Sequence, residues 1–208
     1  MAMTGNPTPG EELTHRVRLG EARLALDLAL ANARRPIVSS KFGPDSAVFL
    51  HFVTRVLPDV PVVRVETGYD TRATTRFVDE LVERLGLDLH VFRPEGHTVT
   101  LPPALDDPAH AAFAREVKVE PFERALVALD ADVWLSSIRR HQSAHRSTEP
   151  AFRTLGSGVL KASPILGWTP DTVARYAAEH DLPTGPEAFD PTKGEPFREC
   201  GLHWAVGA

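Results

Sequence analysis

The stretch Pro36–His51 constrains the fold of this chain more than any other, because it changes from apolar to polar residues and back again within a short distance. The apolar pair Ile37–Val38 ends in polar residues, and an apolar segment with helical periodicity begins after Pro44. This order predicts a strand, a tight loop and a helix. Gly43 permits a positive φ, and a proline suits the first turn of a helix, where its missing N–H is not needed.

The loop between this strand and this helix is a candidate anion site. Backbone N–H groups and the hydroxyls of Ser39 and Ser40 are expected at a helix N-terminus, where the helix dipole favours an anion. Lys41 adds a positive charge. An ordinary strand-to-helix turn explains the loop equally well on this evidence. The loop matches neither the Gly-x-Gly-x-x-Gly pattern nor the Gly-x-x-x-x-Gly-Lys-Ser/Thr pattern.

Strand and helix patterns go on alternating along the rest of the chain. The first helix is marked by apolar residues at helical spacing, Leu13, Val17, Leu24 and Leu28. The predicted helices cover 11–34, 44–57, 71–85, 109–130 (interrupted near Lys118–Pro121, where the proline starts a new helix) and 169–180. The predicted strands cover 37–38, 60–66, 87–92 and 132–137, with one or two short strands within 152–165.

This alternation predicts an α/β fold: a doubly wound, mostly parallel sheet of about five strands with helices on both faces. Residues 1–10 are expected to form a disordered lead, because they are rich in proline, glycine and threonine. Residues 11–181 are predicted to be a single nucleotide-binding domain. Residues 182–208 are predicted to be a mobile C-terminal tail that carries a cysteine.

Composition limits the classes of protein to consider. The 208 residues suffice for one well-filled domain, and 42% hydrophobic with 25% charged residues is ordinary for a soluble protein. The net charge of -5 argues against a general nucleic-acid or membrane-surface binder. No apolar run could span a bilayer and Met1–Gly10 lacks a signal pattern, so a cytoplasmic protein is expected. Cys200 is the single cysteine, so the chain alone forms no disulfide and no cysteine-rich metal site.

Three candidate loops follow predicted strands, at the sheet edge where parallel sheets bind ligands. They cover 39–46, 67–69 and 139–146. The last contains Arg139, Arg140 and Arg146, whose paired donors suit phosphate or sulfate oxygens. A solvated surface loop is the commoner explanation for a basic run in isolation. Lys118 is a further candidate for the same anion, with a surface lysine as the alternative.

Cys200 lies in a polar terminal segment, where a small core residue is not expected. Its neighbours Arg198 and His203 favour the thiolate, which is the reactive form of the side chain. These features indicate a nucleophile.

Taken together, five segments resemble the phosphoadenosine phosphosulfate (PAPS) reductase family of the PP-loop (adenine nucleotide alpha hydrolase-like) superfamily. They occur in the family's order over about residues 36 to 203, and they are Ser39–Gly43, Glu66–Tyr69, Lys118–Pro121, Ile138–Ser143 and Arg198–His203. The terminal Glu-Cys-Gly-Leu-His is the most specific of them.

The resemblance implies a thiol-dependent reduction of PAPS to sulfite and adenosine 3′,5′-bisphosphate. Cys200 would attack sulfur to give an S-sulfocysteine, which a thioredoxin or glutaredoxin thiol then cleaves, with His203 orienting the sulfate. The implied substrate-binding residues, which include five cations, are Ser39, Ser40, Lys41, Phe42, Gly43, Ser46, Thr67, Gly68, Tyr69, Lys118, Arg139, Arg140, Gln142 and Arg146. A related branch uses the unphosphorylated sulfonucleotide and an iron–sulfur cluster on extra cysteines, which this chain lacks. The resemblance therefore implies PAPS as substrate, no metal, no resident cofactor and an external reductant.

The chain departs from the family's pattern in three places. Lys41 replaces a usual serine, Asp70–Thr74 replaces Leu-Phe-Pro-Glu-Thr, and the segment before Cys200 is short. One alternative is an ATP-pyrophosphatase-type PP-loop enzyme that adenylates a substrate, because Asp45–Ser46 keeps part of that signature. Another is a non-catalytic nucleotide-binding or redox-sensing relative. The exact sulfonucleotide, the thiol donor and the choice between monomer and homodimer stay open.

Overall fold

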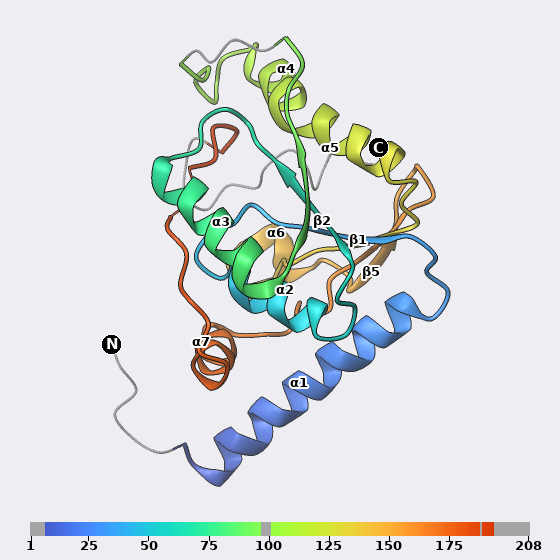
Figure 1. Cartoon of the computed structure of the whole chain (residues 1–208), viewed down its shortest axis with the longest axis vertical. Helices are drawn as coiled ribbons and strands as arrows, with labels where there is room; N and C mark the ends of the chain where they lie inside the picture. Colours follow the sequence, from blue (N-terminus) through green and yellow to red (C-terminus); the bar gives the residue numbers. More distant parts are fainter. Residues whose placement is uncertain (1–6, 97–100, 188, 194–208) are drawn as a thin grey trace.

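The computed structural model describes residues 7–96, 101–187 and 189–193, and it shows one sheet between two layers of helices (Figure 1). The strands are β1 (Pro36–Ser39), β2 (Pro61–Val65), β3 (Asp88–Phe92), β4 (Val133–Leu135), β5 (Phe152–Thr154) and β6 (Leu160–Ala162). Their spatial order is β3-β2-β1-β4-β6-β5, and only β5, which pairs with β6, is antiparallel to its neighbour. The predicted mostly parallel, doubly wound sheet is confirmed, with six strands where about five were expected. The difference arises because residues 152–162 form a hairpin at the sheet edge.

Four helices cover one face of the sheet and share the larger hydrophobic core. They are α1 (Pro9–Leu30), α2 (Ser46–Thr54), α3 (Arg72–Leu85) and α7 (Pro170–Glu179). Val38 and Val62 point into this core from the two central strands. The predicted end of α3 is confirmed at Gly86, which adopts a left-handed φ of 62°.

The opposite face is covered by one continuous helical segment. It consists of α4 (His110–Ala114), the π-helical turn η1 (Arg115–Val119) and α5 (Glu120–Ala128). Phe122 packs on Trp134 of β4 in this second core. The predicted start of a new α-helix at Pro121 is confirmed, and the predicted interruption before it is a π-helical turn rather than a break in the helix. Pro121 lacks an N–H, and it lies in the first turn of α5, directly after the wider turn.

Helix α1 is held to the body by one face only. It begins at Pro9, two residues before the predicted start, because Thr8 and Glu11 form a reciprocal capping box. Its buried residues are His15, Ala22, Leu26 and Ala29. The four apolar residues that marked the helix in the sequence, Leu13, Val17, Leu24 and Leu28, are exposed instead.

The strand order places a switch point between β1 and β4. From β1 the chain proceeds through β2 and β3 on one side, and β4 then pairs on the other side of β1. Ligands of such sheets bind outside the carboxyl ends of the strands that flank this point. The loop after β1 and the segment after β4, with the short helices η2 (Arg140–Gln142) and α6 (Ala144–Ser147), lie there. Within the described residues, no helix is both long and apolar enough to cross a membrane.

Candidate functional site

The loop after β1 presents two oriented hydroxyls. Trp134 Nε1 donates a hydrogen bond to Ser39 Oγ at 2.8 Å, and the backbone N–H of Phe42 donates to Ser40 Oγ at 3.0 Å. Both oxygens therefore act as acceptors within the protein, and each hydroxyl keeps its own hydrogen to donate. Lys41 is exposed, and Ser46, the first residue of α2, is half-buried. The arrangement suits an anion that needs hydrogen-bond donors.

The tight turn of this loop occurs one residue earlier than predicted. Phe42 has a φ of 53°, whereas Gly43 is absent from the described residues with positive φ. A left-handed φ is costly for a bulky residue, and packing has to offset the cost. The Phe42 side chain is fully buried, which supplies that packing. Asp45 precedes the first residue of α2, so Pro44 lies outside the helix rather than in its first turn.

Arg139 joins the loop after β1 to the segment after β4. Its guanidinium forms an ion pair with Asp45, and the side chain is only 5% exposed. Its Nε is buried without a hydrogen-bond partner in the described structure. A buried donor without an acceptor is costly and is ready to bind one. Arg139 is therefore a cation with unused donor capacity at the switch point.

The remaining residues of the basic segment differ in their surroundings. Gln142 Oε1 accepts hydrogen bonds from the backbone N–H of Arg139 at 3.0 Å and from Arg146 Nη1, so it fixes the turn. Arg140 is exposed, and its backbone N–H donates to the carbonyl of Leu166 at 3.0 Å. The segment therefore combines one buried and one exposed arginine with one that is bound to Gln142.

Lys118 and the loop after β2 lie against the segment that follows α7. Lys118, on the π-helical turn, forms an ion pair with Asp190. Burial acts to raise the pKa of Asp190, but the Lys118 ammonium and hydrogen bonds from Lys118 and Thr192 outweigh it and lower the pKa to about 2. Asp190 is therefore a carboxylate at neutral pH.

Tyr69 packs between two aromatic rings, one from helix α4 and one from the segment that follows α7. Its ring centroid is 5.9 Å from that of Phe113 on α4 and 6.5 Å from that of Phe189. Thr67 is buried and Gly68 is exposed. The predicted residues thus form two groups, one around Ser39 and Arg139 and one around Tyr69 and Lys118.

The segment after α7 touches both groups. Asp190 holds Lys118, and the backbone N–H of Gly185 donates to the carbonyl of Pro44 at 3.0 Å. A Cβ on Gly185 would lie 2.6 Å from the Gly43 carbonyl oxygen, so only glycine fits this approach. The described beginning of the predicted tail is thus packed against the candidate site.

One ion pair beside the loop after β1 is not anticipated by the sequence analysis. Arg64 is buried within β2, 3.1 Å from Asp70, and its guanidinium carbon lies 5.9 Å from the centre of the Phe42 ring. Burial raises the pKa of Asp70, and the Arg64 charge opposes that shift. The available signal was a charged residue inside the apolar run Val62–Val65, together with Asp70 at a position where the chain departs from the family's pattern.

A second buried ion pair, between Lys161 and Glu149, lies beside Trp134, the hydrogen-bond donor to Ser39. Lys161 is 2% exposed, binds Glu149 at 3.2 Å and lies 5.5 Å from the centre of the Trp134 ring. Burial lowers the pKa of Lys161, and Glu149 opposes that shift. Because Trp134 in turn donates to Ser39, the pair helps to fix the orientation of that hydroxyl.

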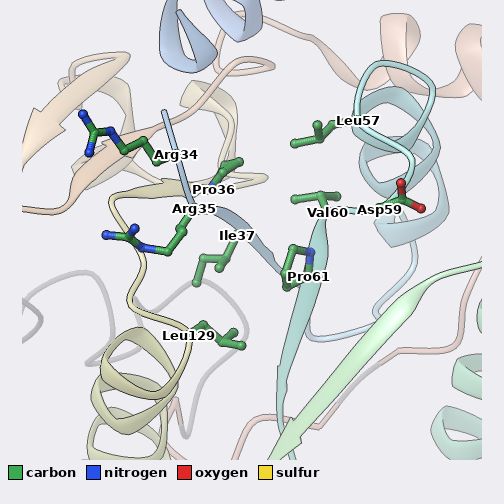
Figure 2. A pocket seen from close by; sticks show the side chains of 9 residues that line it. All are labelled: Arg34, Arg35, Pro36, Ile37, Leu57, Asp59, Val60, Pro61 and Leu129. Atoms are coloured by element: carbon green, nitrogen blue, oxygen red, sulfur yellow. The ribbon is translucent and has the colours of Figure 1, made fainter. Parts of the chain in front are cut away.

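A cavity of about 310 Å³ lies at the opposite edge of the sheet (Figure 2). It opens at the amino ends of β1 and β2, between Ile37 and Pro61, with the charged residues Arg34, Arg35 and Asp59 among its lining. None of the predicted site residues in the described part of the chain lines it. The cavity is therefore distinct from the candidate site.

The two predicted catalytic residues, Cys200 and His203, lie outside the described residues. Within the part of the chain that the structure describes, no group of three or more histidine, cysteine, aspartate or glutamate side chains is placed to hold a metal ion.

Comparison with known proteins gives consistent matches. Residues 35–186 match the model of the phosphoadenosine phosphosulfate reductase domain. A phosphoadenosine 5′-phosphosulfate reductase of Alkalilimnicola ehrlichii is 40% identical, over 86% of this chain and 76% of the relative. One of Photobacterium profundum is 34% identical, over 90% of this chain and 82% of the relative.

Solved structures share the fold at lower sequence identity. The phosphoadenylyl-sulfate reductase of Candida auris, solved as a phosphate complex, superposes with a TM-score of 0.67 at 19% identity, over 87% of this chain and 91% of that one. The FMN adenylyltransferase of Candida glabrata gives a TM-score of 0.63 at 10% identity, over 88% and 61%. At these identities the likeness shows the fold alone.

Proposed function

The chain belongs to the phosphoadenosine phosphosulfate reductase family, and from this premise we propose that it reduces PAPS to sulfite and adenosine 3′,5′-bisphosphate. The matched residues 35–186 include the whole sheet and all three candidate loops. The observation that carries the proposal is Arg139, a buried cation with an unpartnered Nε at the switch point, paired with Asp45 of the loop that also holds the oriented hydroxyls.

The substrate is a polyanion, and the site supplies matching donors. Arg139, Arg140 and Arg146 would bind phosphate and sulfate oxygens from the β4 side through paired N–H groups. From the β1 side, the hydroxyls of Ser39 and Ser40 would donate hydrogen bonds to the same oxygens, and Lys41 would add a further positive charge. Lys118 would join them when an anionic group of the substrate takes the place of Asp190. The other predicted residues of the loops, from Phe42 to Ser46 and from Thr67 to Tyr69, would shape the pocket.

The chemistry would run through Cys200, which follows the family-model match in the sequence. Its thiolate attacks the sulfuryl sulfur, a sulfur–sulfur bond forms, and the bond from sulfur to the bridging oxygen breaks. Adenosine 3′,5′-bisphosphate leaves with that electron pair, and His203 helps to orient the group transferred. A donor thiolate then attacks Cys200 Sγ and releases sulfite, and a second donor thiol reduces the mixed disulfide.

A dithiol protein, thioredoxin or glutaredoxin, thus supplies the two electrons, and the proposal includes no resident cofactor. The reaction would take place in the cytoplasm, where such thiols are kept reduced.

The direct test measures sulfite release with reduced thioredoxin. We expect sulfite from PAPS and much less from its analogue that lacks the 3′-phosphate. Pyrophosphate release from ATP with no sulfite from either sulfonucleotide would contradict the proposal and favour the adenylating alternative.

A matched variant, Cys200→Ser, separates binding from turnover. It should bind adenosine 3′,5′-bisphosphate like the unmodified chain and release no sulfite, because a serine hydroxyl is scarcely ionised at neutral pH. Without a thiol donor, mass spectrometry of the unmodified chain should show one sulfonate on the peptide that contains Cys200. Sulfite production by the serine variant, or an adduct that never forms, would show that Cys200 is not the nucleophile.

A further inference from the structure

His110 is a buried histidine to which the proposed function gives no role. It is the first residue of α4, and it is 8% exposed. None of the five segments that resemble the family contains it. A buried polar side chain needs hydrogen-bond partners, so the contacts of His110 indicate what it does.

The imidazole of His110 bridges two backbone carbonyls that are far apart in the sequence. Its Nδ1 lies 3.1 Å from the carbonyl oxygen of Pro103, and its Nε2 lies 3.2 Å from that of Thr192. Both partners are acceptors, so the ring binds them only as a donor. A neutral imidazole donates to one carbonyl at a time, and an imidazolium donates to both. The ring therefore links the loop before α4 to the segment after α7.

The histidine itself is fixed on α4. Its backbone N–H donates to the carbonyl of Asp107 at 2.9 Å, and its ring centroid is 6.3 Å from that of Phe113. Phe113 in turn packs against Tyr69 of the candidate site. The hydrogen bond between His110 and Thr192 therefore anchors the segment after α7 to the body of the protein.

Thr192 belongs to a short turn that Asp190 closes. The backbone N–H and the hydroxyl of Thr192 donate to Asp190 Oδ1 at 3.1 Å and 2.7 Å, whereas Lys118 is bound to Oδ2. The two sets of donors thus use different oxygens of one carboxylate. When an anion takes the place of Asp190 on Lys118, the bonds within the turn are retained.

Two contacts of different kinds hold this turn at the candidate site. The pairing of Asp190 with Lys118 competes with the substrate, because Lys118 is one of the cations proposed to bind it. The bond from His110 to the carbonyl of Thr192 involves no residue that is proposed to bind the substrate. An anionic ligand at Lys118 therefore breaks the first contact and leaves the second.

The length of chain between this anchor and the cysteine is short. Cys200 follows Thr192 by eight positions, which span at most about 29 Å at about 3.6 Å per residue. If the segment detached as far as Gly185, whose N–H is bonded to Pro44, fifteen positions would span at most about 54 Å. A shorter tether raises the local concentration of the group that it carries.

We propose that His110 is a positioning residue for the nucleophile. It keeps the start of the cysteine-bearing segment at the candidate site after the substrate has displaced Asp190 from Lys118. The inference rests on the proposed function, since it requires a polyanion at Lys118 and a reaction at Cys200. His110 acts through the backbone of Thr192 and touches no reacting atom.

Hydrogen exchange in a Cys200→Ser background tests the anchor without turnover. The amides of Thr192 and Lys193, which donate to Asp190, report on the turn. With His110 present, their exchange should stay slow when PAPS binds. In His110→Phe, which has a ring but no donor, exchange should rise a little without ligand, because Lys118 still holds Asp190. With PAPS it should rise roughly tenfold, the population change for one lost buried hydrogen bond.

The dependence on ligand separates an anchor from a merely structural residue, whose replacement would have the same effect with and without PAPS. His90→Phe is the matched control, because His90 is a half-buried histidine on the edge strand β3, 3.0 Å from Asp88. His110→Gln restores a side-chain donor and should recover part of the protection. Loss of protection on PAPS binding while His110 is present, or an effect of His110→Phe that PAPS does not increase, would overturn the proposal.

The rate of Cys200 sulfonation separates this inference from the proposed function. With saturating PAPS, no thiol donor and Cys200 intact, His110→Phe should form the adduct roughly tenfold more slowly than His90→Phe, for the same lost hydrogen bond. Its affinity for adenosine 3′,5′-bisphosphate should be unchanged. Equal rates in the two variants would overturn the role of His110 and leave the proposed function intact.

An adduct that forms in none of the chains would contradict the proposed function instead. The exchange rates without ligand then decide whether His110 anchors the segment. Equal exchange at Thr192 in His110→Phe and His90→Phe would overturn the anchor as well.

Discussion

At the scale of single residues, three arginines of one basic segment lie in three environments. Arg139 is buried against Asp45, Arg140 is exposed, and Arg146 is bound to Gln142. The sequence identified all three as candidate cations but does not distinguish them, because the carboxylate that holds Arg139 belongs to a residue 94 positions away. Burial of a charge depends on such long-range partners.

We expect Arg139→Ala to weaken the binding of adenosine 3′,5′-bisphosphate by about 1.5–3 kcal/mol, the usual scale for a charged hydrogen bond. The variant also leaves the Asp45 carboxylate unpaired next to the anion, so adding Asp45→Asn should restore part of the loss. Arg140→Ala should weaken binding on the same scale.

Isothermal titration calorimetry measures these effects, with Arg34→Ala as a control. Arg34 is also an exposed arginine, but it lines the cavity at the other edge of the sheet. Unchanged affinity in both the Arg139 and Arg140 variants would show that the basic segment is solvated surface.

At the scale of helices and strands, the alternating sequence pattern was sufficient to locate the main elements. Strands β1 to β4 and the helices between them lie where the pattern predicts, and the loops at their carboxyl ends contain the candidate residues. Periodicity did not reveal which face of α1 meets the body, because this helix has apolar residues on two opposite faces.

Two local features depended on packing that a linear pattern does not contain. The left-handed φ of Phe42 is stable because its ring is buried, whereas glycine at position 43 was the reasonable expectation from intrinsic preference. The π-helical turn that carries Lys118 depends on the hydrogen-bond pattern of a continuous helix. The acidic partners Asp45, Asp70 and Asp190 were missed for a similar reason, since each pairing appears only once the elements pack.

The segment after α7 gives a prediction at this scale. A Cβ at Gly185 would lie 2.4 Å from Phe77 Cε1 and 2.6 Å from the Gly43 carbonyl oxygen. We expect Gly185→Ala to displace the segment from the loop after β1 and to lower the free energy of unfolding by about 1–3 kcal/mol, the usual cost of overpacking.

Urea unfolding and limited proteolysis near residue 185 measure the two effects. Gly167→Ala is the control, because a Cβ there meets nothing within 4 Å. Equal stability and equal protease resistance in the two variants would mean that the segment does not need this close approach.

At the scale of the whole molecule, the sheet is chemically different along its two edges where the parallel strands end, the carboxyl edge and the amino edge. The carboxyl edge carries the hydroxyls, arginines and Lys118 of the candidate site, and the amino edge carries the cavity of about 310 Å³ (Figure 2). The residues that line this cavity include none of the described candidate site residues. The strand order selects the carboxyl edge, because the switch point between β1 and β4 faces that way.

Hydrogen exchange with adenosine 3′,5′-bisphosphate distinguishes the two edges. We expect slower exchange at residues 39–46 and 136–146, because a bound ligand suppresses local opening around its site. The amides of Arg34, Arg35, Ile37 and Val60, next to the cavity, should change little. Protection confined to the amino edge would contradict the assignment of the site.

Two cations of the candidate site already hold carboxylates of the chain as counterions, since Lys118 is paired with Asp190 and Arg139 is paired with Asp45. At Lys118 an incoming anion has to displace the Asp190 carboxylate that is already bound, whereas Arg139 keeps its Nε for a further acceptor beside Asp45. A singly charged ion gains little binding free energy, because it replaces one ion pair by another. A ligand with several linked charges can displace both carboxylates and form an ion pair at each position. The site would then prefer multivalent anions, because every ligand competes with the chain's own carboxylates. Dissolved salt ions would compete poorly for the same cations.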